Sequence, residues 1–397
     1  MGIAVTMNTE PKSGGKRDLD WRVIGAVLGL FLVAVTPIIF NKFFDTSRMG
    51  NPDIWKVLLI AVPVAAVTFC YRKLPCSSNR DRIAIILLIS FIASILVDIH
   101  FVYIDNYDKY ASHYFANFSN PEWQIRLHQS ILNLDPGALP HSYRFLPDSI
   151  VSLFEFFSDD FSYSRFLYRW SSMFVLIFAI YYYSFVVCNR CVAMLTILFY
   201  GLIYQISIRY YAGQLTDPLS HLSFVLSFIF IELDMFIYFV FAIVIGVLAK
   251  ESVAIMAVYY LIFQRRDLNY ALRAFLVTVL AFGTVIAVRI YVNPGFKYAS
   301  ISGAGSMDFI IANLSYYNLW LRQLAFTVGI FIPFVILGWK TAPQSPKRLT
   351  LLLFPVLLGT NVVFSMIHET RNLVPVAIPM ALIAANYLYQ VSDIHDV

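Results

Sequence analysis

The chain has 397 residues, of which 59% are hydrophobic and only 13% are charged, and its mean hydropathy is +0.70. Soluble domains carry roughly 25% charged residues, so this composition excludes an ordinary soluble protein and predicts a polytopic membrane protein. The formal net charge of +5 comes from lysines and arginines in short segments between apolar runs. That pattern is a topology signal and argues against a nucleic-acid-binding patch.

Apolar runs long enough to cross roughly 30 Å of hydrocarbon recur along the chain, and each one predicts a transmembrane helix. Residues 1–22 form a polar, basic tail, and no small-residue cleavage site follows the first run, so we expect a retained first helix and a cytoplasmic amino terminus. We predict twelve spans, near residues 23–40, 54–71, 83–103, 167–187, 192–206, 218–231, 236–249, 251–264, 272–292, 323–338, 349–366 and 373–389.

Alternating sides from this start places the basic loop residues on one face, as the positive-inside rule requires. They are Arg72, Lys73, Arg80, Arg82, Arg190, Arg265, Arg266, Arg273, Lys340, Lys347 and Arg348. Residues 219–264 would also fit two long spans, but only three spans keep the segment 264–266 inside. The expected fold is therefore an all-α, multi-pass integral membrane protein, with residues 391–397 as a cytoplasmic tail.

The longest polar segment, about residues 104–166, then faces away from the cytoplasm and opens with "DNYD" at Asp105 to Asp108. Within it, "PEWQIRLHQSILNLD" (121–135) and "DSIVSLFEFFSDDF" (148–161) mix apolar and polar residues in the manner of amphipathic helices. We expect both to lie along the membrane surface. The prolines and glycine between them predict an ordered, turn-rich connection.

The polar residues of the outward segments are the candidate functional residues, because a charge near the bilayer centre costs about 2.5–3.5 kcal/mol and needs a partner or an aqueous cavity. The candidate substrate-binding residues are His141, Tyr143, Arg144, Arg209, Gln214, Asp217, Lys250, Glu251, His368, Glu369 and Arg371, and the candidate catalytic residues are Asp105 and Asp108. Each one alone has an ordinary interpretation, such as an interfacial ion pair, a lipid-facing arginine or a helix start. Their common side of the membrane favours a single site.

The residue types define the chemistry of such a site. A carboxylate at a water-accessible membrane face can take a proton from a hydroxyl, and arginine or lysine can hold a departing phosphate. Outside the cytoplasm an activated sugar has to arrive on a lipid carrier. Nearby aromatic residues such as Tyr103 and Tyr107 suit either sugar stacking or an interfacial belt.

The order of these features resembles the GT-C class of membrane glycosyltransferases, which use polyprenyl-phosphate sugar donors. "DNYD" is similar to the carboxylate motif that opens the first long extracytoplasmic loop of that class, and "SYRFLPD" to the Tyr-Arg-x-Leu-x-Pro element of bacterial members. "YAGQLTDP", "AKESVAI" and "HETRNLVPVAIPM" are similar to the Gly-Gln, Lys-Glu and late Glu-x-Arg-x-x-x-Pro elements. Each motif is short, so their order and shared sidedness carry the resemblance, which covers about residues 83–390.

The resemblance implies an inverting transfer of a sugar to a glycan, lipid or protein acceptor on the extracytoplasmic face of a bacterial inner or plasma membrane, as in cell-envelope polysaccharide biosynthesis. Asp105 or Asp108 would be the base; Asp105, nearer the helix end, is favoured, and Asp108 would bind the acceptor or a metal. No cofactor is expected, and a divalent cation is compatible but not indicated. Membrane lipids would be partners and nucleic acid would not.

Two departures from the class accompany the resemblance. Residues 23–82 would be two additional helices ahead of the conserved module, and the acidic pair that is adjacent in many members is split here. We expect the branch without a large soluble domain. Two other lipid-handling functions stay open: a polysaccharide polymerase or ligase that depends on outer-loop arginines, and a transporter or flippase built on broken helices and internal repeats. A structural subunit without chemistry is a further alternative.

Overall fold

The computed structural model describes residues 61–74, 78–105, 121–208, 214–263, 268–293, 307–315, 317–365, 367 and 369–393. These residues form helices and short connections, with no β-strand among them. The all-α fold class is therefore confirmed for the described part of the chain. The predicted span at 23–40 lies outside it.

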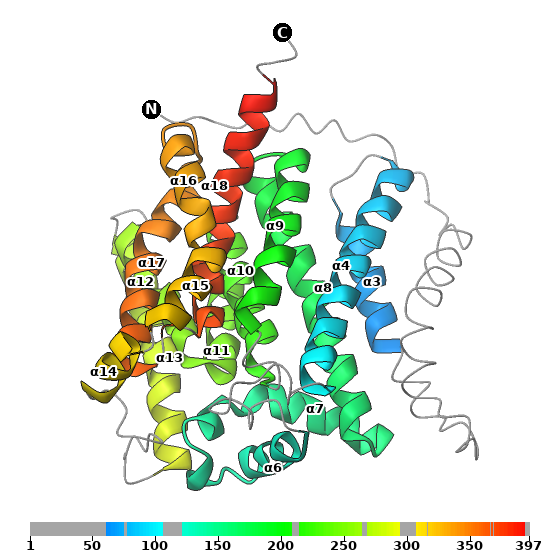
Figure 1. Cartoon of the computed structure of the whole chain (residues 1–397), viewed down its shortest axis with the longest axis vertical. Coiled ribbons are helices and arrows are strands. Elements are labelled where there is room, and N and C mark those ends of the chain that lie inside the picture. Colours follow the sequence, from blue (N-terminus) through cyan, green and yellow to red (C-terminus); the bar gives the residue numbers. More distant parts are fainter. Residues whose placement is uncertain are drawn as a thin grey trace.

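The long helices run side by side as a bundle (Figure 1). Apart from two helices that lie across one end, the α-helices of the described chain are α3 (Ala61–Lys73), α4 (Asn79–Asp105), α8 (Phe161–Val187), α9 (Arg190–Ile208), α10 (Thr216–Glu232), α11 (Phe236–Ala249), α12 (Ile255–Phe263), α13 (Leu268–Val292), α14 (Met307–Ser315), α15 (Tyr317–Thr327), α16 (Ile332–Gly338), α17 (Gln344–Phe364) and α18 (Val374–Asp393). Each apolar run predicted between residues 54 and 389 overlaps one or two of these helices. The short α14 was not predicted.

Six stretches of the described chain are long and apolar enough to cross a membrane: 79–101, 161–187, 190–207, 268–292, 344–364 and 370–392. A seventh results if the bent pair Trp320–Thr327 and Gly329–Gly338 forms one span. The chain is thus an α-helical, multi-pass membrane protein. Helices α11 and α12 are shorter than a hydrocarbon core requires, so the number of twelve spans stays a prediction.

The predicted span at 323–338 differs most from the structure, because the chain bends there by 45° between α15 and the 3-10 turn η6 (Gly329–Phe331). Residues 219–264 contain three helical pieces, α10, α11 and the pair formed by the 3-10 turn η5 (Glu251–Ala254) and α12. The break between α11 and η5 falls at Lys250, whose backbone is extended. Both interruptions leave backbone groups outside regular helix, which membranes tolerate only where protein or water covers them.

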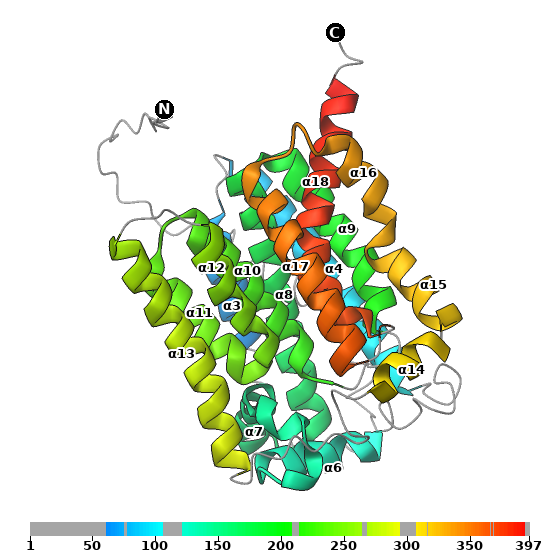
Figure 2. The same ribbon diagram turned by 90° about the vertical axis from the view of Figure 1, so that its left-hand side faces the viewer.

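Two helices lie across one end of the bundle, at the bottom of both views (Figures 1 and 2). They are α6 (Pro121–Leu132) and α7 (Phe145–Ser158), and they coincide with the two predicted surface helices apart from boundary shifts of a few residues. The 3-10 turns η3 (Pro136–Ala138) and η4 (His141–Arg144) connect them, as the predicted turn-rich segment requires. The side chain of Asp160 caps α8 by accepting a hydrogen bond from the backbone N–H of Tyr163, which separates α8 from α7.

At the other end of the bundle, segments that are predicted to face the cytoplasm contact one another. Arg190 pairs with Asp81 at 2.8 Å, and Arg348 donates to the backbone oxygen of Phe263 at 3.2 Å. These contacts place successive inner segments together, as the alternating topology requires. The assignment of this end to the cytoplasm stays a prediction.

The centre of the bundle is filled by α8 and α18, whereas α13 lies at its edge. The membrane-length window of α18 is 72% buried and that of α13 only 17%. Gly246 lets α11 approach its neighbours closely, because a Cβ there would lie 2.6 Å from the Cβ of Ser223 and 2.7 Å from Cγ1 of Val253. This close packing lies one helical turn before Lys250 and therefore fixes the position of the Lys250 backbone.

Candidate functional site

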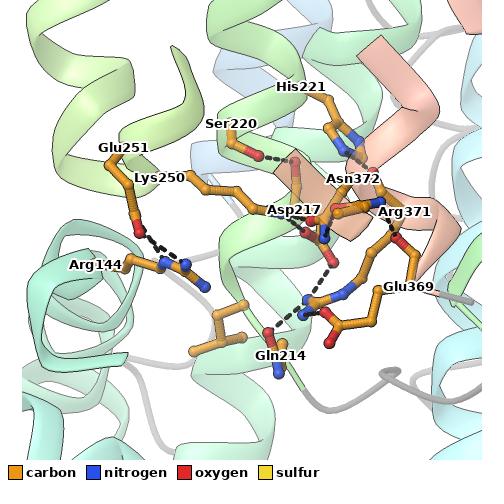
Figure 3. A network of polar contacts seen from close by, with 12 residues as sticks. Arg144, Gln214, Asp217, Ser220, His221, Lys250, Glu251, Glu369, Arg371 and Asn372 are labelled. Atoms are coloured by element: carbon orange, nitrogen blue, oxygen red, sulfur yellow. Dashed lines mark hydrogen bonds and ion pairs between the residues drawn. The ribbon is translucent and has the colours of Figure 1, made fainter. Parts of the chain in front are cut away.

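Asp217 is the centre of a buried ionic network at the end of the bundle that α6 and α7 cover (Figure 3). It lies in the first turn of α10, directly before Pro218, a residue suited to the start of a helix. Its Oδ1 accepts a hydrogen bond from Lys250 Nζ at 3.1 Å, and its Oδ2 accepts one from Arg371 at 3.0 Å. All three residues are buried, so each charge depends on the others for compensation.

Arg371 links this carboxylate to two further polar side chains. Its guanidinium also donates to Gln214 Oε1 and, at 3.0 Å, to Glu369 Oε2. The residue lies in η7 (Thr370–Leu373), a 3-10 turn ahead of α18. His221 in α10 donates from Nε2 to the backbone oxygen of Arg371 at 3.0 Å, which ties this turn to the centre of the bundle.

Lys250 extends the network in the other direction. Its Nζ donates to Asn372 Oδ1 at 2.5 Å, and the amide of Asn372 donates to Asn361 Oδ1 at 3.0 Å. The break between α11 and η5 is what presents this lysine to the site. Because the helix is interrupted at Lys250, the lysine side chain reaches Asp217 inside the bundle and does not face lipid.

Arg144 and Glu251 form a second ion pair between the surface layer and the bundle. Arg144 donates from Nε at 2.9 Å and from Nη2 at 3.0 Å to the two carboxylate oxygens of Glu251. This bidentate geometry is the strongest that an arginine makes with a carboxylate. Because Arg144 immediately precedes α7 and Glu251 follows Lys250, the pair fixes the surface helices over the network (Figure 3).

His141 and Tyr143 lie in η4 beside Arg144 but differ in their surroundings. Burial, together with the positive charges of Arg144 and Arg371, lowers the pKa of His141 to about 3, so its imidazole is neutral. Tyr143 is buried against Leu139 and Val292, in a small apolar cluster. The guanidinium of Arg289 also lies 5.6 Å from its ring centre, and the substrate-binding role of Tyr143 stays a prediction.

The structure therefore brings seven of the predicted residues into two neighbouring groups: Arg144 with Glu251, and Gln214, Asp217, Lys250, Glu369 and Arg371 with one another. Three others, Asp108, Arg209 and His368, lie outside the described residues. Asp105 is the last residue of α4, and the described features do not include its side chain. The catalytic role of the two aspartates stays a prediction.

A polar group that sequence reasoning missed lies in the surface layer. His128 of α6 contacts Asp148 Oδ1 through Nδ1 at 2.8 Å and Glu155 Oε2 through Nε2 at 2.9 Å, both on α7. Burial alone would lower the pKa of His128, but the hydrogen bonds and charges of the two carboxylates outweigh it and raise the pKa. Burial raises the pKa of Asp148. The hydrogen bonds from His128 to these two carboxylates therefore hold α6 against α7.

A second missed group lies within the predicted spans. Arg169 of α8 contacts Nδ1 of His100 of α4 at 2.7 Å and donates to the backbone oxygen of Gln214 at 3.0 Å. His100 in turn contacts the hydroxyl of Tyr204 of α9 at 3.1 Å. The signal was present in the sequence, since an arginine inside an apolar run marks a functional or pairing position.

A cavity adjoins the ionic network between the surface layer and the starts of α8 and α10. It is lined by Gln124, Leu127, His128, Ile131, His141, Asp148, Phe161, Gln214, Leu215 and Thr216. Gln214 belongs to both the cavity and the network, so a ligand in the cavity would lie next to Arg371.

No family model, no curated protein and no solved structure matches this chain. Among the described residues, no group of histidine, cysteine, aspartate and glutamate side chains is arranged to hold a metal ion. The site offers buried arginine and lysine side chains for an anion, and carboxylates for hydroxyl groups. The resemblance to the GT-C class depends on the sequence motifs.

Proposed function

We propose that this protein is a membrane glycosyltransferase that transfers a sugar from a polyprenyl-phosphate donor to a glycan, lipid or protein acceptor on the extracytoplasmic face. The observation that carries the proposal is the convergence of Arg144, Asp217, Lys250, Glu251 and Arg371 on two neighbouring ionic groups, from four motifs that are far apart in the sequence. Arginine and lysine at a membrane-embedded site suit the phosphate of a lipid donor.

The reaction would be a single displacement. The acceptor hydroxyl oxygen forms a bond to the anomeric carbon while the bond between that carbon and the phosphate oxygen breaks, and the electron pair leaves on the phosphate. Asp105 or Asp108 takes the hydroxyl proton or orients the acceptor. Arg144, Lys250, Arg371 and, outside the described residues, Arg209 stabilise the charge that develops on the phosphate.

The two described groups together hold three cations and three carboxylates, so an incoming phosphate has to compete with a carboxylate for a cation. The cations are Arg144, Lys250 and Arg371, and the carboxylates are Asp217, Glu251 and Glu369. The side chains of Glu251 and Glu369 are 23% and 17% exposed, whereas that of Asp217 is 2% exposed. We therefore expect the donor phosphate to displace one of the two glutamates and Asp217 to stay in place.

One observation favours a transporter or flippase as a second candidate. The chain is broken at Lys250 and bent by 45° between Thr327 and Gly329, and discontinuous helices line the substrate sites of many transporters. Such a protein would bind a lipid-linked substrate at the same cations but would not cleave the bond between sugar and phosphate.

The test is to purify the protein with its endogenous lipids, identify what co-purifies by mass spectrometry, and incubate the protein with polyprenyl-phosphate sugars in vesicles. We expect a polyprenyl-phosphate sugar to co-purify and free polyprenyl phosphate to accumulate as the sugar is transferred. Movement of an intact lipid-linked sugar across the bilayer, with no release of lipid phosphate, would establish the second candidate instead.

A further inference from the structure

Arg289 is a cation close to the ion pair of Arg144 and Glu251, and none of the sequence motifs includes it. It lies in the last turn of α13, and its guanidinium is 5.6 Å from the ring centre of Tyr143, the residue next to Arg144. It also interacts electrostatically with Glu251, the carboxylate that Arg144 binds. Arg289 therefore belongs to the surroundings of this ion pair.

The helix that carries Arg289 is the least buried of the six candidate spans of the described chain, with 17% of its membrane-length window buried. It stands at the edge of the bundle, and its carboxyl-terminal end reaches the surface layer (Figure 2). There it packs against η4, which holds Arg144, and against η5, which holds Glu251. Arg289 thus approaches the ion pair from the side of the molecule that faces lipid.

The position of Arg289 on α13 is a boundary between the lipid-facing side of the helix and its interior side. Ile286, three residues earlier, is 48% exposed, whereas Val292, three residues later, is buried against Tyr143. Residues three apart are neighbours on a helix surface, so the partly exposed Arg289 borders both sides. An arginine there can lay its stem along apolar surface and extend its guanidinium to a lipid phosphate. The exposed Tyr291 beside it is typical of the headgroup region.

Two ordinary effects would also favour an arginine at this position. The helix dipole stabilises a cation in the last turn, and an aromatic ring attracts a guanidinium. Arg273, at the other end of α13, allows a comparison, because its guanidinium lies 5.4 Å from the ring centre of Phe236 and 3.9 Å from Asp234. Arg273 shares the aromatic contact but lies far along the helix from the two ionic groups. It is therefore the matched control for Arg289.

The charges around Arg289 suit one phosphate group. Arg144 and Arg289 are two cations against the one carboxylate of Glu251, and the donor phosphate is a diester with one ionised oxygen. A phosphate that contacts Arg289 can therefore replace Glu251 at the bidentate face of Arg144. After transfer the lipid phosphate is a monoester with a charge of about −1.5 to −2, so a second arginine would also stabilise the leaving group.

We propose that Arg289 binds the phosphate of the lipid-linked donor as it arrives from the bilayer and positions it against Arg144, while the polyprenyl chain lies along the exposed apolar side of α13. This inference rests on the proposed function, because it takes a polyprenyl-phosphate sugar as the donor. It identifies the side from which the donor enters and a donor-binding residue outside the sequence motifs.

The test measures binding of decaprenyl phosphate to the full chain in neutral detergent micelles, by thermophoresis of the labelled protein. The variants are Arg289→Gln, which removes the charge, Arg289→Lys, which keeps it, and the control Arg273→Gln. Two other ligands serve as comparisons: decaprenol, which lacks the phosphate, and phosphatidylglycerol, which is an ordinary anionic lipid. Thermal unfolding establishes that each variant is folded.

We expect the wild-type protein and Arg273→Gln to bind decaprenyl phosphate equally, and Arg289→Gln to bind it about tenfold more weakly, which is the lower value for a hydrogen bond to a charged group. Arg289→Lys should recover part of the affinity, because lysine holds a phosphate as a point charge without the fork of arginine. Decaprenol should bind equally to all four proteins. A merely structural role of Arg289 would weaken the binding of both polyprenyl lipids.

Hydrogen exchange of the wild-type protein gives a second measurement that needs no substitution. Decaprenyl phosphate should slow exchange in the last turn of α13 and leave its first turn, near Arg273, unchanged. This result decides the matter if Arg289→Gln does not fold. Equal exchange with and without the lipid at the last turn would overturn the inference.

Wild-type affinity in Arg289→Gln, or an equal loss in Arg273→Gln, would also overturn it. So would phosphatidylglycerol that binds as tightly as decaprenyl phosphate with the same dependence on Arg289, because the arginine would then be a general headgroup contact. Two further results separate the inference from the proposed function. Binding of decaprenyl phosphate that depends on Arg289, in a protein that releases no lipid phosphate from a sugar donor, would retain this site and refute the transferase. Transfer with an unchanged donor KM in Arg289→Gln would retain the transferase and refute this site.

Discussion

Asp217 and Arg371 are 154 positions apart in the chain, yet their side chains are joined at 3.0 Å with both residues almost fully buried. Lys250 completes the arrangement from a third element. One carboxylate thus binds two buried cations, of which Lys250 has Asp217 as its carboxylate partner and Arg371 also pairs with Glu369. The side chain of Asp217 is almost fully buried, whereas those of Glu251 and Glu369 are more exposed, and these two are the carboxylates that we propose a substrate phosphate displaces.

Asp217→Asn keeps the shape of the side chain but removes its charge. We expect a loss of about 3–5 kcal/mol of stability, because the substitution leaves two buried cations facing a neutral group. Thermal unfolding in detergent measures it. Asp81→Asn is the matched control, since it breaks the half-exposed pair with Arg190, and its melting temperature should change little. Equal effects of the two substitutions would contradict the central position of Asp217.

Gly246→Ala tests the close packing that positions Lys250. The added methyl would lie within 3 Å of Ser223 and Val253, so α11 has to move and the stability should fall by about 1–3 kcal/mol. Gly283→Ala on α13 is the control, because nothing lies within 4 Å of the new methyl. That control should be neutral or slightly stabilising. If both variants unfold at the wild-type temperature, the close contact has no energetic role.

The contact between α6 and α7 should weaken as the pH rises. The pKa of His128 is raised by Asp148 and Glu155, and burial raises that of Asp148. A group with a raised pKa in the folded protein contributes stability at low pH that is lost as the pH climbs through that pKa. For His128 the loss begins above about pH 6.5. Hydrogen exchange of α6 from pH 5 to 9 should show faster opening at the alkaline end.

His128→Gln provides the control for this pH dependence. Glutamine has no ionisable group in this range, so exchange of α6, corrected for its intrinsic rate, should lose the part of the pH dependence that begins above about pH 6.5. In both proteins, the pH dependence of exchange in α18, at the bundle centre, should be that of the intrinsic exchange rate alone. A His128→Gln protein with the wild-type pH profile would show that the imidazole does not carry the effect.

Arg144 and Glu251 can be tested by exchanging their charges. Arg144→Glu and Glu251→Arg should each lower stability by about 1–3 kcal/mol, because either change opposes like charges where a bidentate pair now lies. The double variant restores opposite charges and should recover part of the loss. A double-mutant cycle measured by thermal unfolding gives the coupling. Additive losses would mean that the two side chains do not interact in solution.

Most of the bundle helices were predictable because each one contains a long apolar run. The run at 236–249 became α11 with the same bounds, and the surface helices matched their amphipathic segments. The bend between α15 and α16 has a signal that run length does not register, since Gly329 begins η6 and Pro333 lies in the first turn of α16. Run length reports which segments are helical but not where a helix breaks.

Much of the site was predictable for a different reason. Charged residues between apolar runs, such as Lys250 and Arg371, stand out in a chain with few charges. His128 and Asp148 did not stand out, because polar residues are expected in a surface helix and only the packing of α6 on α7 brings them together. Arg169 and His100 carried a readable signal as polar residues inside apolar runs, although their partnership required the fold.

The measurement that tests the central claim most directly is single-turnover release of lipid phosphate from a polyprenyl-phosphate sugar, by the purified chain and by a variant with both Asp105→Asn and Asp108→Asn. The account predicts release coupled to sugar transfer in the wild-type protein, and its loss in the double variant with donor still bound. Transfer at the wild-type rate by the double variant would contradict the assignment of the base, and no release by the wild-type protein would contradict the proposed function.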